Sequence, residues 1–231
     1  MEYPDPALAS ADLRTCDSGR LPAVPPLQRT EPILEQPRRQ TEHHPRGAGL
    51  TTTDDIRATR QKLVLDHFRD EVRQNWDDVL ATFPHPHYEL IPTMTVHDGD
   101  RAVRSYYHDS RVAFPDQDHE IIDLRHSDDA AIVEFWLLGT HLGALGAIPA
   151  TGSRFRVRMT AYFIFDEDEN LVCERVYFDS LTLLKQLIGG LNMRNPQNWL
   201  LAARCVRGAL KWAAGATPHP TLVNSPRAEM P

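Results

Sequence analysis

The sequence predicts an α+β domain in which helices cover one face of a curved antiparallel sheet. Two observations predict it. Apolar residues recur at helical spacing over residues 53–83, and four strand-like segments with short connections follow later in the chain. Consecutive strands with short links form antiparallel sheets, and helices that precede such a meander pack on one of its faces. The other face is then exposed or paired with another subunit.

The first 50 residues differ from the rest of the chain. They contain 8 of the 18 prolines, mix both signs of charge and show no sustained apolar period. Such a segment buries too little apolar surface to offset the entropy of ordering it. Residues 1–50 are therefore predicted to be a disordered tail, and residues 53–190 are predicted to form the α+β domain.

Two amphipathic helices are predicted at the start of this domain. The first stops before Pro84, and its apolar stripe consists of Leu65, Phe68, Val72, Trp76, Val79, Leu80 and Phe83. A polar turn at residues 97–99 introduces the second helix, whose apolar residues are Val103, Tyr106, Tyr107 and Phe114. Between the two helices, residues 87–92 form a candidate short strand.

Four long strands follow, rich in β-branched and aromatic residues. They span residues 119–125, 130–141, 154–166 and 171–179, with turn-like sequences between them. Next, LTLLKQLIGG (residues 181–190) predicts a short helix that ends at its two glycines.

The C-terminal part, residues 191–231, is predicted to add one amphipathic helix and a disordered tail from residue 216. Pro196 stands near the helix start. One face carries Trp199, Ala203, Val206 and Leu210, and the opposite face carries Arg204, Arg207 and Lys211. This helix could dock on the core, pack in an oligomer or cover a pocket, and its pattern fits all three.

Composition excludes several classes of partner. The chain has 231 residues, a formal net charge of -7 and a pI of about 5.9, so no overall basic field attracts nucleic acid or anionic membranes. The N-terminus lacks the pattern of a signal peptide, and no apolar run reaches the length of a membrane span. Three widely separated cysteines indicate neither a disulfide framework nor a thiolate metal site, and they fit a reducing cytoplasm.

Asp179 is the first candidate catalytic residue, because a carboxylate stands between a strand and a helix among apolar neighbours. Strand alternation puts Asp179 on the same face as Tyr177, while Val176 and Phe178 face the other way. If the face of Asp179 is enclosed, desolvation raises the carboxyl pKa towards neutrality and favours proton transfer. The alternative is that Asp179 only caps the helix.

His141 is the second candidate, at the end of a strand that is nearly free of charge. A neutral imidazole could donate a hydrogen bond to a substrate carbonyl or take a proton beside a carboxylate. The alternative is a histidine at the edge of a loop with one satisfied hydrogen bond. The positions of His141 and Asp179 on two strands of one meander permit a shared cavity.

Other residues have weaker claims. Glu134 is a second candidate for a perturbed carboxylate, or else a partner for one of the alternating arginines that include Arg158. The candidate pocket residues, each of which could equally belong to the core or to a sheet surface, are Tyr106, Tyr107, Trp136, Glu134, Arg158, Phe163 and Tyr177.

The histidines give no metal site from sequence. His43, His44, His85 and His87 have no carboxylate or cysteine at ligand spacing, which favours surface histidines. The glycines of GTHLGALG fit no phosphate-binding motif, and no nucleophile elbow is present. A reaction at this site would be acid–base chemistry that needs no cofactor.

Two segments resemble a known family. HLGALGAIPATGSRF (residues 141–155) and RVYFDSLTLLKQLIG (residues 175–189) are similar to sequences of the SnoaL-like polyketide cyclases, in the nuclear transport factor 2-like superfamily. The resemblance implies a cystatin-like α+β cone, in which a bent sheet wrapped by helices encloses a deep apolar pocket. It also implies an intramolecular aldol ring closure, with Asp179 as general acid/base and His141 assisting. The QLIG sequence departs from the usual QLG, and both tails are extra.

Three functions stay open on these grounds. The first is a polyketide cyclase-type enzyme acting on an apolar or aromatic small molecule. The second is another pocket enzyme, either an isomerase or an epoxide hydrolase. An epoxide hydrolase needs a second carboxylate near an inward arginine such as Arg158 or Arg175. The third is a non-catalytic binding or dimerisation module. A homodimer is expected, because the resemblance implies a superfamily whose members commonly dimerise and because the outer face of the sheet is predicted to be uncovered.

Overall fold

The computed structural model describes residues 52–215 and 217–224. The predicted tail at residues 1–50, with Cys16, His43 and His44, lies outside these described residues. Residues 217–224, for which disorder was predicted, include a short helix, α6 (Pro220–Val223). A backbone hydrogen bond of 2.8 Å from His219 N to Met94 O joins this segment to the sheet region.

The long N-terminal helix predicted from sequence is two helices. α1 (Thr53–Arg73) begins with a capping box between Thr52 and Asp55. It ends where Gln74 adopts a left-handed conformation with φ 61°. α2 (Trp76–Ala81) follows, and its Val79 and Leu80 join the same core as Val64 and Phe68 of α1. The apolar spacing continues across Gln74, which is why the break was invisible in the pattern.

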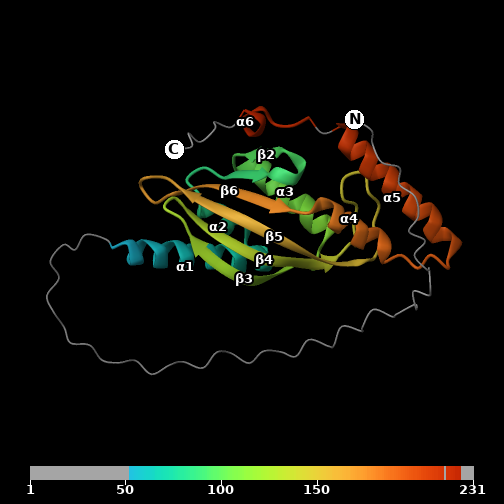
Figure 1. Cartoon of the computed structure of the whole chain (residues 1–231), viewed down its shortest axis with the longest axis horizontal. Coiled ribbons are helices and arrows are strands. Elements are labelled where there is room, and N and C mark those ends of the chain that lie inside the picture. Colours follow the sequence, from blue (N-terminus) through green and yellow to red (C-terminus); the bar gives the residue numbers. More distant parts are fainter. Residues whose placement is uncertain (1–51, 216, 225–231) are drawn as a thin grey trace, which may run out of the picture. The chain divides into compact units, whose positions relative to one another are not determined.

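Six strands form one curved sheet in the order β2-β1-β6-β5-β4-β3 (Figure 1). Their bounds are β1 (His87–Leu90), β2 (Thr95–Asp98), β3 (Asp118–His126), β4 (Ala130–Thr140), β5 (Arg154–Phe165) and β6 (Leu171–Phe178). A 3-10 turn, η1 (Ile91–Thr93), joins β1 to β2. The predicted antiparallel meander of β3 to β6 is confirmed. The parallel pairing of β1 with β6 was not predicted.

The sheet has one covered and one open face. α3 (Asp100–Ala113), α1 and α2 pack on the covered face, where Phe135, Met159 and Phe163 join the core cluster. Trp136 points to the opposite face, and the guanidinium carbon of Arg156 lies 4.1 Å from the centroid of one of its rings. This arrangement is the predicted α+β cone with helices on one side.

The C-terminal helices extend the domain. α4 (Ser180–Gly189) follows β6 directly, and α5 (Pro196–Gly215) crosses the loop at residues 143–153 (Figure 1). α5 docks through small residues: Cys205 and Gly208 are buried, and a Cβ on Gly208 would lie 2.3 Å from Ala147 O. The apolar face that the sequence singled out is the exposed one, at Trp199, Val206 and Leu210. Small side chains permit close helix packing, and the apolar pattern alone did not show this.

Within residues 52–215 and 217–224, no helix is both long and apolar enough to cross a bilayer.

Candidate active site

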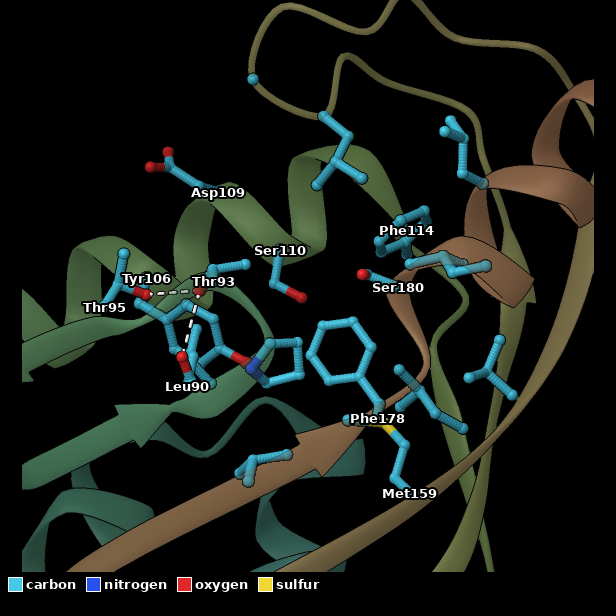
Figure 2. A pocket seen from close by; sticks show the side chains of 18 of the residues that line it. Leu90, Thr93, Thr95, Tyr106, Asp109, Ser110, Phe114, Met159, Phe178 and Ser180 are labelled. Carbon is cyan, nitrogen blue, oxygen red and sulfur yellow. Dashed lines mark hydrogen bonds between the residues drawn. The ribbon is translucent and has the colours of Figure 1, made fainter. Parts of the chain in front are cut away.

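A cavity of about 710 Å³ lies between α3, the covered face of the sheet and α4. Figure 2 shows Ser110 of α3 pointing towards Phe178 of β6 across this space. The strands contribute an apolar wall of alternate residues, namely Leu90, Phe135, Leu137, Val157, Met159, Val176 and Phe178. A volume and lining of this kind match small-molecule sites in general.

The outer part of the cavity wall comes from the C-terminal segment. Ala209 and Ala213 of α5 and Pro218 beyond it line the cavity, together with Leu181 and Leu184 of α4. The enclosure is therefore completed by residues far from the strands in sequence.

A group of polar side chains lines the part of the cavity formed by the N-terminal helices and the sheet. Five of them line the cavity, and they come from α1, β1, α3, β3 and β6: Glu71, Tyr88, Tyr106, His119 and Glu174. Two of the five carry buried atoms that have no hydrogen-bond partner among the described residues, namely His119 Nδ1 and Glu174 Oε2. Polar groups in an apolar enclosure are costly to bury, so this concentration points to a ligand site.

A hydrogen-bonded chain supports this set from behind. Tyr88 Oη lies 2.9 Å from His67 Nε2 and is hydrogen-bonded to Tyr107 Oη. His67 Nδ1 lies 3.0 Å from Thr82 Oγ1, and that hydroxyl donates to Val79 O. Because the hydroxyl proton is used on Val79 O, His67 Nδ1–H is the donor to Thr82.

Glu71 has the most perturbed carboxyl group in the cavity. Burial, followed by repulsion from Glu174, raises the pKa of Glu71 to about 7. His67, Tyr107 and Arg111 act in the opposite direction. Two carboxyl groups that share a buried site do not both ionise easily, so Glu71 is partly protonated near neutral pH. Glu174 Oε2 lies 3.3 Å from His67 Nε2 but makes no hydrogen bond with the described residues.

The two histidines behave differently. Burial lowers the pKa of His119 to about 3, and the charges of Arg111 and His67 add to this, so its imidazole is neutral. His119 Nε2 lies 3.7 Å from Glu71 Oε2, and among the described residues its Nδ1 has no hydrogen-bond partner. Burial alone would lower the pKa of His67, but Glu174, Glu71 and Asp70 raise it above its ordinary value.

Tyr106 adds a hydroxyl group to the cavity. Burial, together with the charges of Glu71 and Glu174, raises the pKa of Tyr106 above its ordinary value. The phenol therefore stays protonated at neutral pH and acts as a hydrogen-bond donor. Tyr106 is the single residue of the predicted pocket set that lines the cavity.

Asp179 does not line the cavity. It is exposed and caps α4, accepting hydrogen bonds from the amides of Leu181 at 2.9 Å and Thr182 at 3.1 Å. The Thr182 hydroxyl, which also donates to the carboxylate, is the main reason that the pKa of Asp179 is lowered. Because Val176 and Phe178 occupy the cavity face, alternation sends Asp179 elsewhere. Its catalytic role stays a prediction, and this placement gives it no support.

His141 lies outside the lining of the cavity. It is fully buried beside Phe114, and its Nδ1 lies 3.1 Å from Thr151 Oγ1. Burial lowers the pKa of His141, and its Nε2 has no hydrogen-bond partner within the described part of the chain. His141 is absent from the cavity lining, so the structure does not bring it together with Asp179 at that surface.

The other predicted pocket residues lie behind or outside the wall. Glu134, Trp136, Arg158 and Tyr177 lie on the open face of the sheet, where Arg158 Nη2 is 2.7 Å from Glu134 Oε1. Tyr107 and Phe163 belong to the buried core. These placements correct the predicted lining, and the reason is the same alternation: the covered face carries Phe135 and Val157 rather than Trp136 and Arg158.

Sequence reasoning missed Glu71, His119 and Glu174, although a signal was present for two of them. Glu71 stands three residues after Phe68 on the apolar stripe of α1, which is an unusual position for a carboxylate. Glu174 shares strand parity with Val176 and Phe178. His119 had no such signal, because β3 is an edge strand with a mostly exposed pattern.

Solved structures share the fold. A putative polyketide cyclase from Xanthomonas campestris pv. campestris matches with a TM-score of 0.50 and 17% identity, over 57% of this chain and 98% of that one. TsrD from Streptomyces laurentii matches with a TM-score of 0.49 and 24% identity, over 57% and 96%. A putative SnoaL-like polyketide cyclase from Jannaschia sp. CCS1 gives 0.48 and 15%, over 56% and 92%.

The sequence comparisons give a family and no individual relative. No curated protein matches the chain significantly. The SnoaL-like polyketide cyclase family matches residues 62–187, which is more than half of the 231 residues and runs from within α1 into α4. The chain thus belongs to the SnoaL-like polyketide cyclase family.

Proposed function

We propose that this protein catalyses acid–base chemistry on an apolar or aromatic small molecule, of the polyketide-cyclase type. An intramolecular aldol closure, or a related isomerase or lyase reaction, starts with removal of a proton next to a carbonyl group. The observation that carries the proposal is the pKa of about 7 of Glu71 in the wall of a large apolar cavity. A carboxyl group with this pKa both accepts and returns protons at neutral pH.

The neighbouring groups supply the rest of the chemistry. In its ionised form, Glu71 would take the proton, and the protonated Tyr106 hydroxyl would stabilise the enolate oxygen. Neutral His119, whose Nδ1 is free of described partners, offers a second hydrogen bond to the substrate. Glu71 would then return the proton. These transfers require no group other than the side chains of the cavity.

This assignment differs from the one implied by sequence resemblance. Asp179 caps a helix at the surface, and His141 lies outside the cavity lining, so the geometry favours Glu71 as the proton carrier. The two assignments make opposite statements about two single substitutions, Glu71→Gln and Asp179→Asn. Both substitutions keep the side-chain shape and remove the charge.

The experiment measures exchange of α-hydrogens for deuterium in an aromatic polyketide ester, added to the full chain in D2O. We expect Glu71→Gln to slow exchange by roughly 100-fold or more, as for loss of a general base. Asp179→Asn is expected to keep the exchange rate. Full exchange in Glu71→Gln, or loss of exchange in Asp179→Asn with a native fold, would refute the assignment to Glu71.

A binding module without catalysis is the second candidate. The exposed cap position of Asp179, bonded to helix amides, is the observation that favours it. A ligand that raises the melting temperature while the wild-type chain leaves its α-hydrogens unexchanged would support this function. The epoxide hydrolase alternative has less support, because Arg158 and Arg175 bond Glu134 and Glu89 outside the cavity lining.

We also propose a cytoplasmic homodimer that pairs through the open face of the sheet. Tyr177 is exposed there, and Tyr162 contacts it with ring centroids 5.6 Å apart. Sedimentation at micromolar concentration is expected to give twice the mass of the chain, and Tyr177→Glu is expected to reduce it to the monomer. A wild-type monomer under these conditions would contradict the dimer.

A further inference from the structure

Three side chains with metal-binding atoms meet on the open face of the sheet. His87 and Glu89 of β1 lie beside Cys173 of β6, and one ligand atom from each lies within 4.8 Å of the others. The parallel register that pairs Glu89 with Arg175 brings these strands together. Tyr88 and Glu174, the neighbours in sequence, face the cavity instead. The cluster is therefore separate from the candidate active site.

His87 is held in the orientation that a metal ligand needs. Its Nδ1 lies 2.8 Å from Asp98 Oδ1, and this carboxylate also lies 2.9 Å from His85 Nε2. With Nδ1–H donated to Asp98, the lone pair is on Nε2, which lies 3.5 Å from Glu89 Oε1. A carboxylate behind a histidine fixes its tautomer in the same way at known zinc sites.

Glu89 has one oxygen engaged and one available. Its Oε2 accepts a hydrogen bond from Arg175 Nε, while Oε1 faces His87. The Glu89 side chain is only 10% exposed, so its charge is balanced in the metal-free protein by Arg175. The free oxygen therefore points into the cluster with little competition from water.

Cys173 supplies the third donor. It is only 8% exposed and lies on β6, the strand next to β1 in the sheet. A bound divalent cation takes the thiolate and releases the proton to solvent, since metals bind the deprotonated sulfur.

We infer that His87 Nε2, Glu89 Oε1 and Cys173 Sγ form a zinc-binding site that joins β1 to β6. Nitrogen, oxygen and sulfur donors together suit Zn²⁺, whereas Mg²⁺ and Ca²⁺ prefer oxygen alone. Tetrahedral bonds of about 2.0–2.3 Å place donors roughly 3.5 Å apart, so the cluster needs to contract by about 1 Å. Three protein ligands leave the fourth position to water or to another ligand.

Cobalt substitution tests this site in the full chain after removal of metals with a chelator. Co²⁺ bound to a thiolate gives a sulfur-to-metal charge-transfer band in the near ultraviolet, and tetrahedral geometry gives strong visible bands. We expect one Co²⁺ per chain with both signatures, and displacement of Co²⁺ by one equivalent of Zn²⁺. Absence of binding, or binding without the charge-transfer band, would overturn the proposal.

Matched variants identify the ligands. Cys173→Ser is expected to lose the charge-transfer band, while Cys205→Ser and Cys16→Ser keep it. Asp98→Asn, a change at a positioning residue, is expected to weaken Co²⁺ binding by about 10–100-fold with the band retained. If Cys173→Ser does not fold, His87→Gln serves as the second test through loss of affinity. A band that survives Cys173→Ser and disappears in either of the other two serine variants would refute the site.

Discussion

Cys173 and Glu174 are consecutive residues of β6, yet their side chains lie on opposite faces of the sheet. Glu174 lines the large cavity, whereas Cys173 belongs to the cluster with His87 and Glu89. One strand therefore positions a group of the candidate active site and a group of the proposed metal site. Because the two side chains share only backbone, a conservative change at Cys173 should leave ligand binding in the cavity intact.

The pKa of Glu71 has a consequence for stability. Its value of about 7 in the folded chain exceeds the ordinary value of 4.5, so the folded state holds the proton more tightly. The stabilisation is complete below pH 4.5 and is lost as the pH rises to about 7. Relative to Glu71→Gln, we expect the wild type to lose about 2–3 kcal/mol of unfolding free energy between pH 4 and pH 8.

Urea denaturation of both proteins across this pH range measures the effect. The difference between the two is the informative quantity, because His67 and His119 titrate in both. A wild-type curve parallel to that of Glu71→Gln would show that folding leaves the pKa of Glu71 at its ordinary value, and the proposal of Glu71 as proton carrier would lose its basis.

The cap at α4 gives a prediction for Asp179. Asp179→Ala removes the acceptor for the amides of Leu181 and Thr182, so the melting temperature should fall by roughly 2–4 °C. Asp179→Asn keeps an acceptor oxygen and should restore most of the loss. Differential scanning calorimetry checks both values, and equal melting temperatures for the wild type and Asp179→Ala would contradict a capping role.

Gly208 should be intolerant of a side chain. A Cβ there would lie 2.3 Å from Ala147 O and 2.8 Å from Ala147 C, both backbone atoms that cannot rotate away. Gly208→Ala should push α5 off the loop at a cost of about 1–3 kcal/mol. Gly215→Ala on the same helix is the control, because nothing lies within 4 Å of its added carbon.

Hydrogen exchange followed by mass spectrometry locates the effect of this change. We expect faster exchange in α5 of Gly208→Ala and little change in β4 and β5. Unaltered protection of α5 in this variant would mean that the helix does not depend on its close contact with Ala147.

Arg60 should not be replaceable by lysine. Its guanidinium bonds Glu169 through Nε at 2.6 Å and Nη2 at 2.8 Å, and Nη1 donates to Asp128 O at 3.0 Å. The side chain is 6% exposed and also lies over the ring of Phe165. An ammonium group cannot reproduce this fork, so Arg60→Lys should cost about 1–2 kcal/mol of unfolding free energy.

Arg57→Lys provides the comparison for that measurement. Arg57 is half exposed and lies 3.9 Å from Asp54, so the same substitution should leave the urea midpoint unchanged. Equal midpoints for the two lysine variants would show that the bidentate geometry at Arg60 adds nothing.

The fold was largely predictable from sequence because it depends on periodicity. Alternation in β4 and β5 and helical spacing around Val103 identified the meander and α3. The break at Gln74 was not predictable from the apolar pattern, which runs on across a single left-handed residue. The pairing of β1 with β6 depends on chain segments about 85 residues apart, which local patterns do not report.

The candidate site was less predictable, because the face of the sheet that becomes enclosed is a tertiary property. Alternation placed Asp179 and Tyr177 together, and it also placed Val176 and Phe178 together, without choosing between the faces. The choice depends on where the helices pack. Tyr106 was predicted because it stands on the apolar face of a helix. Glu71 was missed because the face of α1 that it shares with Phe68 was interpreted only as part of the hydrophobic core.

The enclosure completed by Ala209, Ala213 and Pro218 comes from outside the segment that the family shares. The polar groups of the candidate active site and the closing wall are thus encoded in different stretches of the chain. Lengthening a side chain at position 209 or 213 would shrink the cavity while Glu71, His119 and Glu174 keep their places. Substitutions in this C-terminal segment alone would therefore change the size of ligand that the cavity accepts, both in evolution and in protein engineering.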